Sequence, residues 1–222
     1  MPIPNSFHGH GTFIYNAHDT IKAFGSPAAV ADAIHHCGMH AAWVRVHGRT
    51  VGFGHDPSTR DLVAALRAAG IAVAGWGWCQ GDDTAAEAHL AIDNLAALAI
   101  ADYIADIEEG VNHAHWTPAD VGDFLGRVRA GMPASGSLAV SSFPVITWHS
   151  PELMHAAIPF VDAFAPQTYW FHFPNAKMRK EFGSQYALDR AAAYVELSLA
   201  DWRGITDKPL VATGQAYWGE GH

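Results

Sequence analysis

The sequence predicts an α/β fold, a (β/α)8 TIM-like barrel truncated after its seventh strand. Apolar β-like runs return about every thirty residues along the 222-residue chain. They are continuously apolar rather than alternating, as is typical of parallel strands covered on both faces. Alanine-rich stretches of helical periodicity separate these runs. No GxGxxG turn follows the first run, which disfavours the competing architecture, an open doubly wound sheet.

Seven runs have the length and composition of strands. They span residues 11–16, 41–47, 71–78, 102–108, 137–143, 161–169 and 209–217. The crossover between two parallel strands of one sheet is almost always right-handed. A repeated unit of strand, loop and helix therefore closes most readily into a barrel.

Five stretches between the strands are predicted to be helices. They span residues 27–37, 57–69, 84–99, 118–130 and 186–202. A side-chain oxygen followed by proline marks four helix starts, at Ser26-Pro27, Asp56-Pro57, Thr117-Pro118 and Ser150-Pro151. The oxygen caps the first turn, and proline loses nothing at the first helical position because an N–H there has no partner within the helix. Gly38 and Gly70 supply the left-handed residue that ends a helix.

Length and composition favour one domain that spans residues 1–222. Half of the residues are hydrophobic and 16% are charged, which is enough apolar material for one substantial core. A length of 222 residues is near the lower limit for eight strand–helix units. Because a seven-stranded barrel leaves strand edges open, we expect the chain to be a fragment of a longer protein. A short barrel is the alternative.

The charge balance limits the classes of partner. Thirteen basic and 22 acidic side chains give a net charge of −9, so phosphate-rich partners are repelled and nucleic acid is not expected as a ligand. No run of eighteen apolar residues indicates a membrane span, and the first residues lack the basic and apolar regions of a signal peptide. Cys37 and Cys79 lack CxxC spacing and are expected to be separate free thiols.

The segment 101–110 carries the strongest functional signal, because a strand there ends in acids and then a glycine. Side chains alternate between the two faces of a strand, so Asp106 and Glu108 point the same way with their roots roughly 6 to 7 Å apart. The carboxyl ends of parallel strands are where α/β folds hold catalytic residues. Burying two neighbouring acids without a function is costly. The pair therefore predicts carboxylate-driven catalysis, whereas Glu109 is expected to be solvated.

The other strand ends bring aromatic and hydrogen-bonding side chains to the same face. The candidate substrate-binding residues are Asn16, Asp19, Arg45, His47, Trp76, Trp78, Gln167, Tyr169, Trp170, Gln215 and Tyr217. Aromatic rings stack on the apolar faces of sugars while polar groups bind the hydroxyls, so this mixture favours a carbohydrate ligand. Trp76 and Trp78 fit packing inside the barrel equally well. Arg45 is expected to pair with an acid, for which Asp106 is available.

Four segments, taken in order, resemble the TIM-barrel glycoside hydrolases related to the family 25 lysozymes, which occur in bacteriophage lysins and tail proteins and in bacterial cell-wall enzymes. They are 103–108 (YIADIE, for the DxE motif of the fourth strand), 140–144 (VSSFP), 165–170 (APQTYW) and 209–217 (PLVATGQAY). The resemblance implies cleavage of a β-linked amino-sugar backbone, with peptidoglycan as the first candidate. It also implies that Glu108 is the general acid and that Asp106 orients an acetamido group or stabilises the oxocarbenium-like charge.

Two departures from that family leave a non-catalytic function open. The family also places an aspartate at the end of the first strand and another acid late in the barrel. This chain has Asn16, with Asp19 nearby, and Gln167 at those places. The first alternative is therefore a carbohydrate-binding or structural barrel of a phage tail or a cell surface.

A metal-dependent hydrolase is the second alternative, because HxH pairs suit zinc. His8 and His10 precede the first strand, whereas His113 and His115 follow the acidic strand. An HxH pair in a loop without further ligands is more often exposed to solvent, so no metal and no other cofactor is expected. The expected partner is a peptidoglycan-like polysaccharide, in an extracellular, cell-wall-associated or phage-virion setting and within a larger chain or virion assembly.

Overall fold

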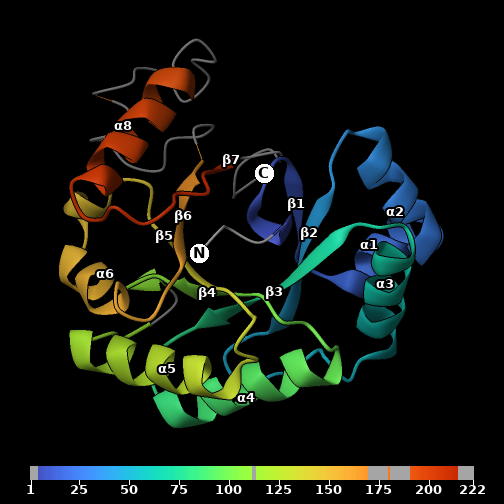
Figure 1. Cartoon of the computed structure of the whole chain (residues 1–222), viewed down its shortest axis with the longest axis horizontal. Helices are drawn as coiled ribbons and strands as arrows, with labels where there is room; N and C mark the ends of the chain where they lie inside the picture. Colours follow the sequence, from blue (N-terminus) through green and yellow to red (C-terminus); the bar gives the residue numbers. More distant parts are fainter. Residues whose placement is uncertain (1–4, 112–113, 170–179, 181–190, 215–222) are drawn as a thin grey trace.

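The computed structural model describes residues 5–111, 114–169, 180 and 191–214. A parallel sheet of seven strands runs through them in the order β1-β2-β3-β4-β5-β6-β7. The strands are β1 (Gly11–Ile14), β2 (Ala41–His47), β3 (Ala72–Cys79), β4 (Tyr103–Ile107), β5 (Leu138–Ser142), β6 (Ala163–Thr168) and β7 (Thr213–Gly214). Each strand pairs with the strands before and after it in the chain, and the sheet curls into a half-barrel (Figure 1).

The helices lie around the outside of the curled sheet (Figure 1). They are α1 (Ala17–Phe24), α2 (Pro27–His36), α3 (Pro57–Ala68), α4 (Thr84–Ala97), α5 (Pro118–Gly131), α6 (Pro151–Ala157) and α8 (Ala191–Arg203), with the 3-10 helices η1 (Asn5–Phe7) and η3 (Ile146–Trp148). The α/β class and the parallel strand order are therefore as predicted. Within the described ranges, no helix has both the length and the apolar character that a membrane span requires.

Local sequence signals account for most helix boundaries. The side chains of Ser26, Asp56 and Thr117 each accept a hydrogen bond from the backbone N–H three residues on, at the start of α2, α3 and α5. Ser150 makes no such bond, although α6 does begin at the proline that follows it. Gly70, with φ of 75°, follows α3 in the left-handed conformation that glycine adopts without strain.

Two predicted elements differ from the structure. The run 11–16 was predicted to be one strand, but β1 ends at Ile14 and Asn16 caps α1, a helix that was not predicted. The run 209–217 contains only β7 and an isolated bridge from Leu210 to Phe164 in its described part, and residues 215–217 lie outside the described residues. The fifth predicted helix is described from Ala191 onward as α8.

The sheet separates two apolar layers. The larger layer joins the helices to the outer face of the strands, with fully buried Leu62 and Phe124 from helices and Ile107 from β4 among its members. The smaller layer lies on the concave face and is made of strand residues and Phe7 of η1. Its buried members are Phe7, Trp43, Ala74, Trp76, Ile104, Ala139, Ala163 and Ala165. Bulky rings from β2 and β3 therefore face small alanines from β5 and β6 across the interior.

The segment η1 covers the amino end of this interior. Phe7 packs edge-on against Trp43, with ring centroids 5.6 Å apart, and the Trp43 Nε1–H donates to the carbonyl oxygen of Ser6 over 2.7 Å. The Ser6 hydroxyl in turn donates to the Asp102 carboxylate just before β4. Because this end is occupied by protein, a ligand would reach the interior from the carboxyl ends of the strands.

Candidate functional site

A ring of polar and aromatic side chains follows the apolar layer on the concave face. Side chains two residues apart share a strand face, so the inward layer continues on five strands with Arg45, Trp78, Asp106, Ser141 and Gln167. In the register of the sheet, Trp78, Asp106 and Ser141 are direct neighbours on β3, β4 and β5. This ring is the candidate functional site.

Asp106 is the centre of a hydrogen-bonded group. Gln167, two strands away on β6, donates from Nε2 to the Asp106 Oδ1 over 2.8 Å and also lies 3.2 Å from the Ser141 Oγ. The Ser141 hydroxyl is itself hydrogen-bonded with Asp106. These neighbours are neutral, so they fix the position of the Asp106 carboxyl group without neutralising its charge.

The surroundings of Asp106 favour its protonated form. Burial raises the pKa of its carboxyl group well above the ordinary value of 3.8, and the negative charge of Glu108 raises this pKa further. The hydrogen bonds from Gln167 and Ser141 and the more remote charge of Arg45 oppose that rise. A carboxyl group whose pKa is raised keeps its proton to higher pH than an ordinary aspartate, as a general acid requires.

Glu108 follows directly after β4 and is half-buried. Its effect on the pKa of Asp106 places the two acids within reach of each other's charge. Glu109 is exposed, as predicted. Asp106 and Glu108 are therefore an interacting pair of acids, in which the charge of Glu108 disfavours ionisation of Asp106.

Arg45 is not paired with Asp106, and the expected ion pair was wrong. Among the described residues, no ion pair within 4.0 Å includes Arg45. Its guanidinium group instead lies over the rings of Tyr15, Phe53 and Trp76, at 4.4, 5.3 and 5.6 Å from their centroids. Aromatic faces carry negative partial charge and attract a cation without neutralising it.

Aromatic rings line the side of the site that β1 and β3 form. Trp76 is buried, and its Nε1–H donates to the Ile14 carbonyl over 3.2 Å, so it packs the interior as well as bordering the site. Trp78 is half-buried against the same layer. Phe13 and Tyr15 are 37% and 67% exposed, although both contact the Trp76 ring. Neither was among the candidate binding residues; Phe13 lies on β1 and Tyr15 directly after it, and both rings face Trp76.

His47 does not lie with these residues. It is buried on the outer side of the sheet, where a Cβ atom on Gly77 would come within 2.0 Å of its Nε2. The Nδ1 lies 3.0 Å from the Gly48 carbonyl oxygen, and the Nε2 lies 2.6 Å from the Tyr103 hydroxyl. Burial and the charge of Arg45 lower the pKa of His47 to about 4. Its role is therefore within the layer between the sheet and the helices.

Asn16 and Asp19 interact with each other at the start of α1. The Asn16 Oδ1 accepts the Asp19 backbone N–H over 3.1 Å, and the Asn16 Nδ2 donates to the Asp19 carboxylate over 2.7 Å. Asp19 also lies 3.3 Å from the Nδ1 of His18. Both predicted binding residues are exposed at the rim and act as a helix cap.

Four other candidate binding residues lie next to, or within, segments outside the described residues. Tyr169 follows β6 and is half-buried, whereas Trp170, Gln215 and Tyr217 lie outside the described residues. Cys37 is exposed and Cys79 buried, and both are free thiols as expected.

The HxH pairs do not form a metal centre in the described part of the chain. No group of three histidine, cysteine, aspartate or glutamate side chains there is arranged to hold a metal ion. His115 is exposed, and His113 lies outside the described residues.

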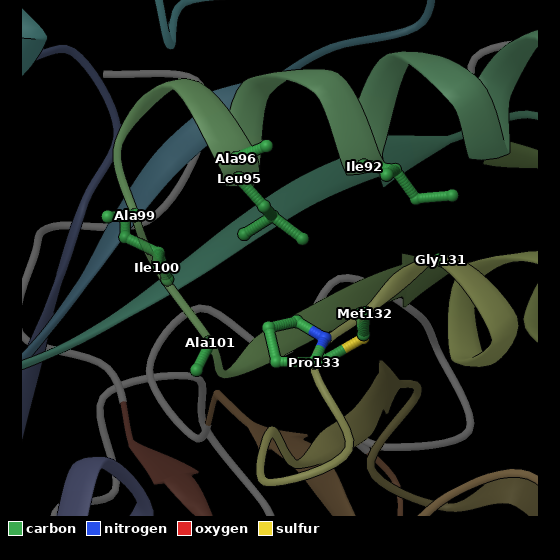
Figure 2. A pocket seen from close by; sticks show the side chains of 9 residues that line it. All are labelled: Ile92, Leu95, Ala96, Ala99, Ile100, Ala101, Gly131, Met132 and Pro133. Atoms are coloured by element: carbon green, nitrogen blue, oxygen red, sulfur yellow. The ribbon is translucent and has the colours of Figure 1, made fainter.

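An apolar crevice of about 480 Å³ lies elsewhere on the molecule (Figure 2). Its walls come from the end of α4 and from the segment after α5, at the amino ends of β4 and β5. The lining residues are Ile92, Leu95, Ala96, Ala99, Ile100, Ala101, Gly131, Met132 and Pro133. No ionisable side chain is among them, and the acids lie at the opposite end of β4, so the crevice is not part of the candidate site.

Comparison with known proteins gives a likeness of fold alone. No protein-family model and no curated protein matches the chain. Two structures of the carboxyl transferase domain of Rhizobium etli pyruvate carboxylase, one with 3-bromopyruvate, superpose with TM-scores of 0.52 and 0.51 at 11% and 13% identity. The superpositions cover 90% of this chain and 36% of each of those chains. The chain therefore spans about a third of the length of these structural neighbours.

A third similar structure is a putative dehydrogenase from Burkholderia cenocepacia with bound NADP. It has a TM-score of 0.43 and 14% identity, over 98% of this chain and 97% of that one.

Proposed function

We propose that the chain is a glycoside hydrolase that acts on a cell-wall polysaccharide, with peptidoglycan as the first candidate. The observation that supports this most strongly is the interacting acid pair of Asp106 and Glu108, with the half-buried ring of Trp78 next to Asp106 in the sheet. Glycosidic bond cleavage uses two carboxyl groups. Sugar rings stack on aromatic side chains. The site offers both.

In this proposal the acid pair holds one proton near neutral pH. Glu108 lies beyond the end of β4, nearer the open end of the interior, and delivers the proton to the leaving oxygen. When that proton is on Glu108, Asp106 carries the negative charge of the pair, is fixed by Gln167 and Ser141, and stabilises the positive charge that develops on the sugar. As the bond from the anomeric carbon to the leaving oxygen breaks, the protonated leaving group departs as an alcohol. Water then bonds to the anomeric carbon, and the proton that this water loses returns to the acid pair.

The proposed fold is a (β/α)8 barrel of the TIM type, of which the described residues form seven strands. Its support is the sequential parallel order of the strands, the helices outside them and the filled interior. A polysaccharide of the cell wall as substrate places the protein outside the cytoplasm, at a cell wall or on a phage virion.

A sugar-binding barrel without hydrolysis is the second candidate, and one observation favours it. The resemblance to lysozymes implies further acids where this chain has Asn16 and Gln167. Asn16 caps α1, and Gln167 is a hydrogen-bond donor to Asp106. Neither supplies a second catalytic carboxylate.

The test is release of soluble sugar from purified peptidoglycan by the wild type, Glu108→Gln and Asp106→Asn. Glu109→Gln is the matched control, since it removes an exposed neighbouring charge. A pull-down with the same insoluble material measures binding. Release by the wild type and the control alone, with binding by all four proteins, supports the hydrolase. Binding without release by any of them supports the sugar-binding barrel, and neither binding nor release refutes both.

A further inference from the structure

We infer that Arg45 and the rings around it form a subsite for a sugar that carries a carboxylate, so that the substrate is an acidic polysaccharide. The inference rests on the proposed function, because it names the substrate class for the same site. Its starting point is Arg45, which makes no ion pair within 4.0 Å among the described residues.

The guanidinium group of Arg45 is enclosed by three aromatic rings. The distances from its central carbon to the ring centroids are 4.4 Å for Tyr15, 5.3 Å for Phe53 and 5.6 Å for Trp76. The rings exclude water from the flat faces of the guanidinium and fix its orientation. Because Tyr15 is 67% exposed and Arg45 half-buried, this group borders solvent. A ligand can therefore reach it.

Among the described residues, Arg45 makes one side-chain hydrogen bond and no ion pair. Its Nε–H donates to the His47 carbonyl oxygen over 3.3 Å, and within the described part of the chain no carboxylate lies within 4.0 Å of it. Arg49 and Arg129, by contrast, each have an aspartate at 2.6 Å. A guanidinium has five N–H groups in a planar fork that matches a carboxylate. The two terminal nitrogens of Arg45 can bind both oxygens of one carboxylate.

The subsite lies within one or two sugar rings of the acid pair. Arg45 pairs in register with Trp76 on β3, and the next residue on that face of β3, Trp78, pairs with Asp106. Two strand spacings and an offset of two residues along the strands separate the backbones of Arg45 and Asp106, about 12 Å in all. The Arg45 charge acts on Asp106, in agreement with this separation. A sugar whose carboxylate binds Arg45 would place a neighbouring glycosidic bond near Glu108.

The overall charge favours a carboxylate over a more highly charged group. The chain carries a net charge of −9, and two acids lie beside the subsite. A dianionic phosphate would meet about twice the repulsion that a single carboxylate meets. The apolar rings beside Arg45 suit the ring face of a uronic acid.

The experiment measures binding of two acidic polymers, polygalacturonate and polyglucuronate, each beside its own carboxyl-reduced neutral derivative. All proteins carry Glu108→Gln, so that no turnover occurs. The variants are Arg45→Gln, which removes the charge, Arg45→Lys, which keeps the charge but not the fork, and Arg49→Gln as the matched surface control. Affinities are measured at low and high salt.

We expect the parent protein to bind one acidic polymer about tenfold or more tightly than its reduced form. Arg45→Gln should remove that preference, Arg45→Lys should keep part of it, and Arg49→Gln should keep all of it. Equal binding of the acidic and reduced polymers, or a preference that survives Arg45→Gln, would overturn the inference and leave a neutral-sugar site standing. Binding of none of the four polymers would overturn it too, and the peptidoglycan experiment then decides the proposed function separately.

Discussion

His47 should make the stability of the fold depend on pH in a measurable way. The imidazole is buried between a carbonyl acceptor and a hydroxyl, so its Nδ1–H donates to Gly48 and its Nε2 accepts from Tyr103. A proton on Nε2 would leave the Tyr103 hydroxyl without its acceptor and place a charge in the apolar layer. The fold therefore holds His47 neutral, with a pKa of about 4 instead of 6.5. The perturbation that tests this is His47→Gln, which keeps an acceptor but cannot titrate.

The direction and the size of this pH dependence follow from the pKa of His47 in the folded chain and in the unfolded chain. Between pH 6.5 and 4 the unfolded chain binds a proton at His47 that the folded chain does not, so stability falls as pH falls through this window. Above pH 6.5 the contribution is fully present. A difference of 2.5 pKa units amounts to about 3 kcal/mol over the whole window, and most of it, about 2.5 kcal/mol, is lost between pH 7 and 4.5.

The assay is urea unfolding followed by tryptophan fluorescence at pH 7, 6, 5 and 4.5. The wild type should lose about 2.5 kcal/mol more than His47→Gln over this range. Thr168→Val is the control, because it removes a buried hydrogen bond to the Thr213 carbonyl that does not titrate. Thr168→Val should lower the free energy of unfolding by the same amount at every pH. If the wild type and His47→Gln lose stability in parallel, His47 is not held neutral and the reasoning fails.

Three further predictions concern the same sheet. Gly77→Ala should destabilise the fold by about 3 kcal/mol in urea unfolding, because its Cβ would lie 2.0 Å from the buried His47 ring; an unchanged midpoint would contradict this packing. Asp106→Asn should gain stability over the wild type as pH rises above 3.8, because the folded chain keeps the Asp106 proton to higher pH than the unfolded chain; a gain that stays constant with pH would exclude a raised pKa. A thiol reagent should label Cys37 at once and Cys79 only after unfolding, because Cys79 is fully buried and burial raises the pKa of its thiol; two thiols labelled in the native protein would refute that burial.

Elements that local chemistry specifies could be predicted from the sequence. The pairs of a capping residue and a proline gave the starts of four helices, including α3 and α5. The continuous apolar runs gave the parallel strands, with β2 at its observed bounds. The helix α1 could not be predicted in this way, because Asn16 reads as the polar end of an apolar strand as easily as the first residue of a helix. Only the fold shows that it accepts the Asp19 N–H.

The face of the sheet on which a side chain lies is harder to predict than the strand to which it belongs. Simple alternation puts His47 on the same face as Arg45, and it was predicted to bind substrate for that reason. The register between β2 and β3 shifts between Arg45 and His47. A bulge of this kind adds one residue to a strand and reverses the faces after it. His47 therefore faces the helices, and no feature of the sequence alone marks the shift.

The absence of the predicted ion pair between Arg45 and Asp106 and the raised pKa of Asp106 have one physical cause. An ion pair with Arg45 would hold the pKa of Asp106 down, as an opposite charge at close range does. The three rings of Tyr15, Phe53 and Trp76 bind the guanidinium instead, and the closest partners of Asp106 are the neutral Gln167 and Ser141. Burial and the charge of Glu108 then raise the pKa of Asp106 without an ion pair to Arg45 to offset them, and among the described residues Arg45 makes no ion pair within 4.0 Å. A sheet that brought the two together would gain an ion pair, and it would lose the raised pKa of Asp106 and the anion subsite that we propose at Arg45.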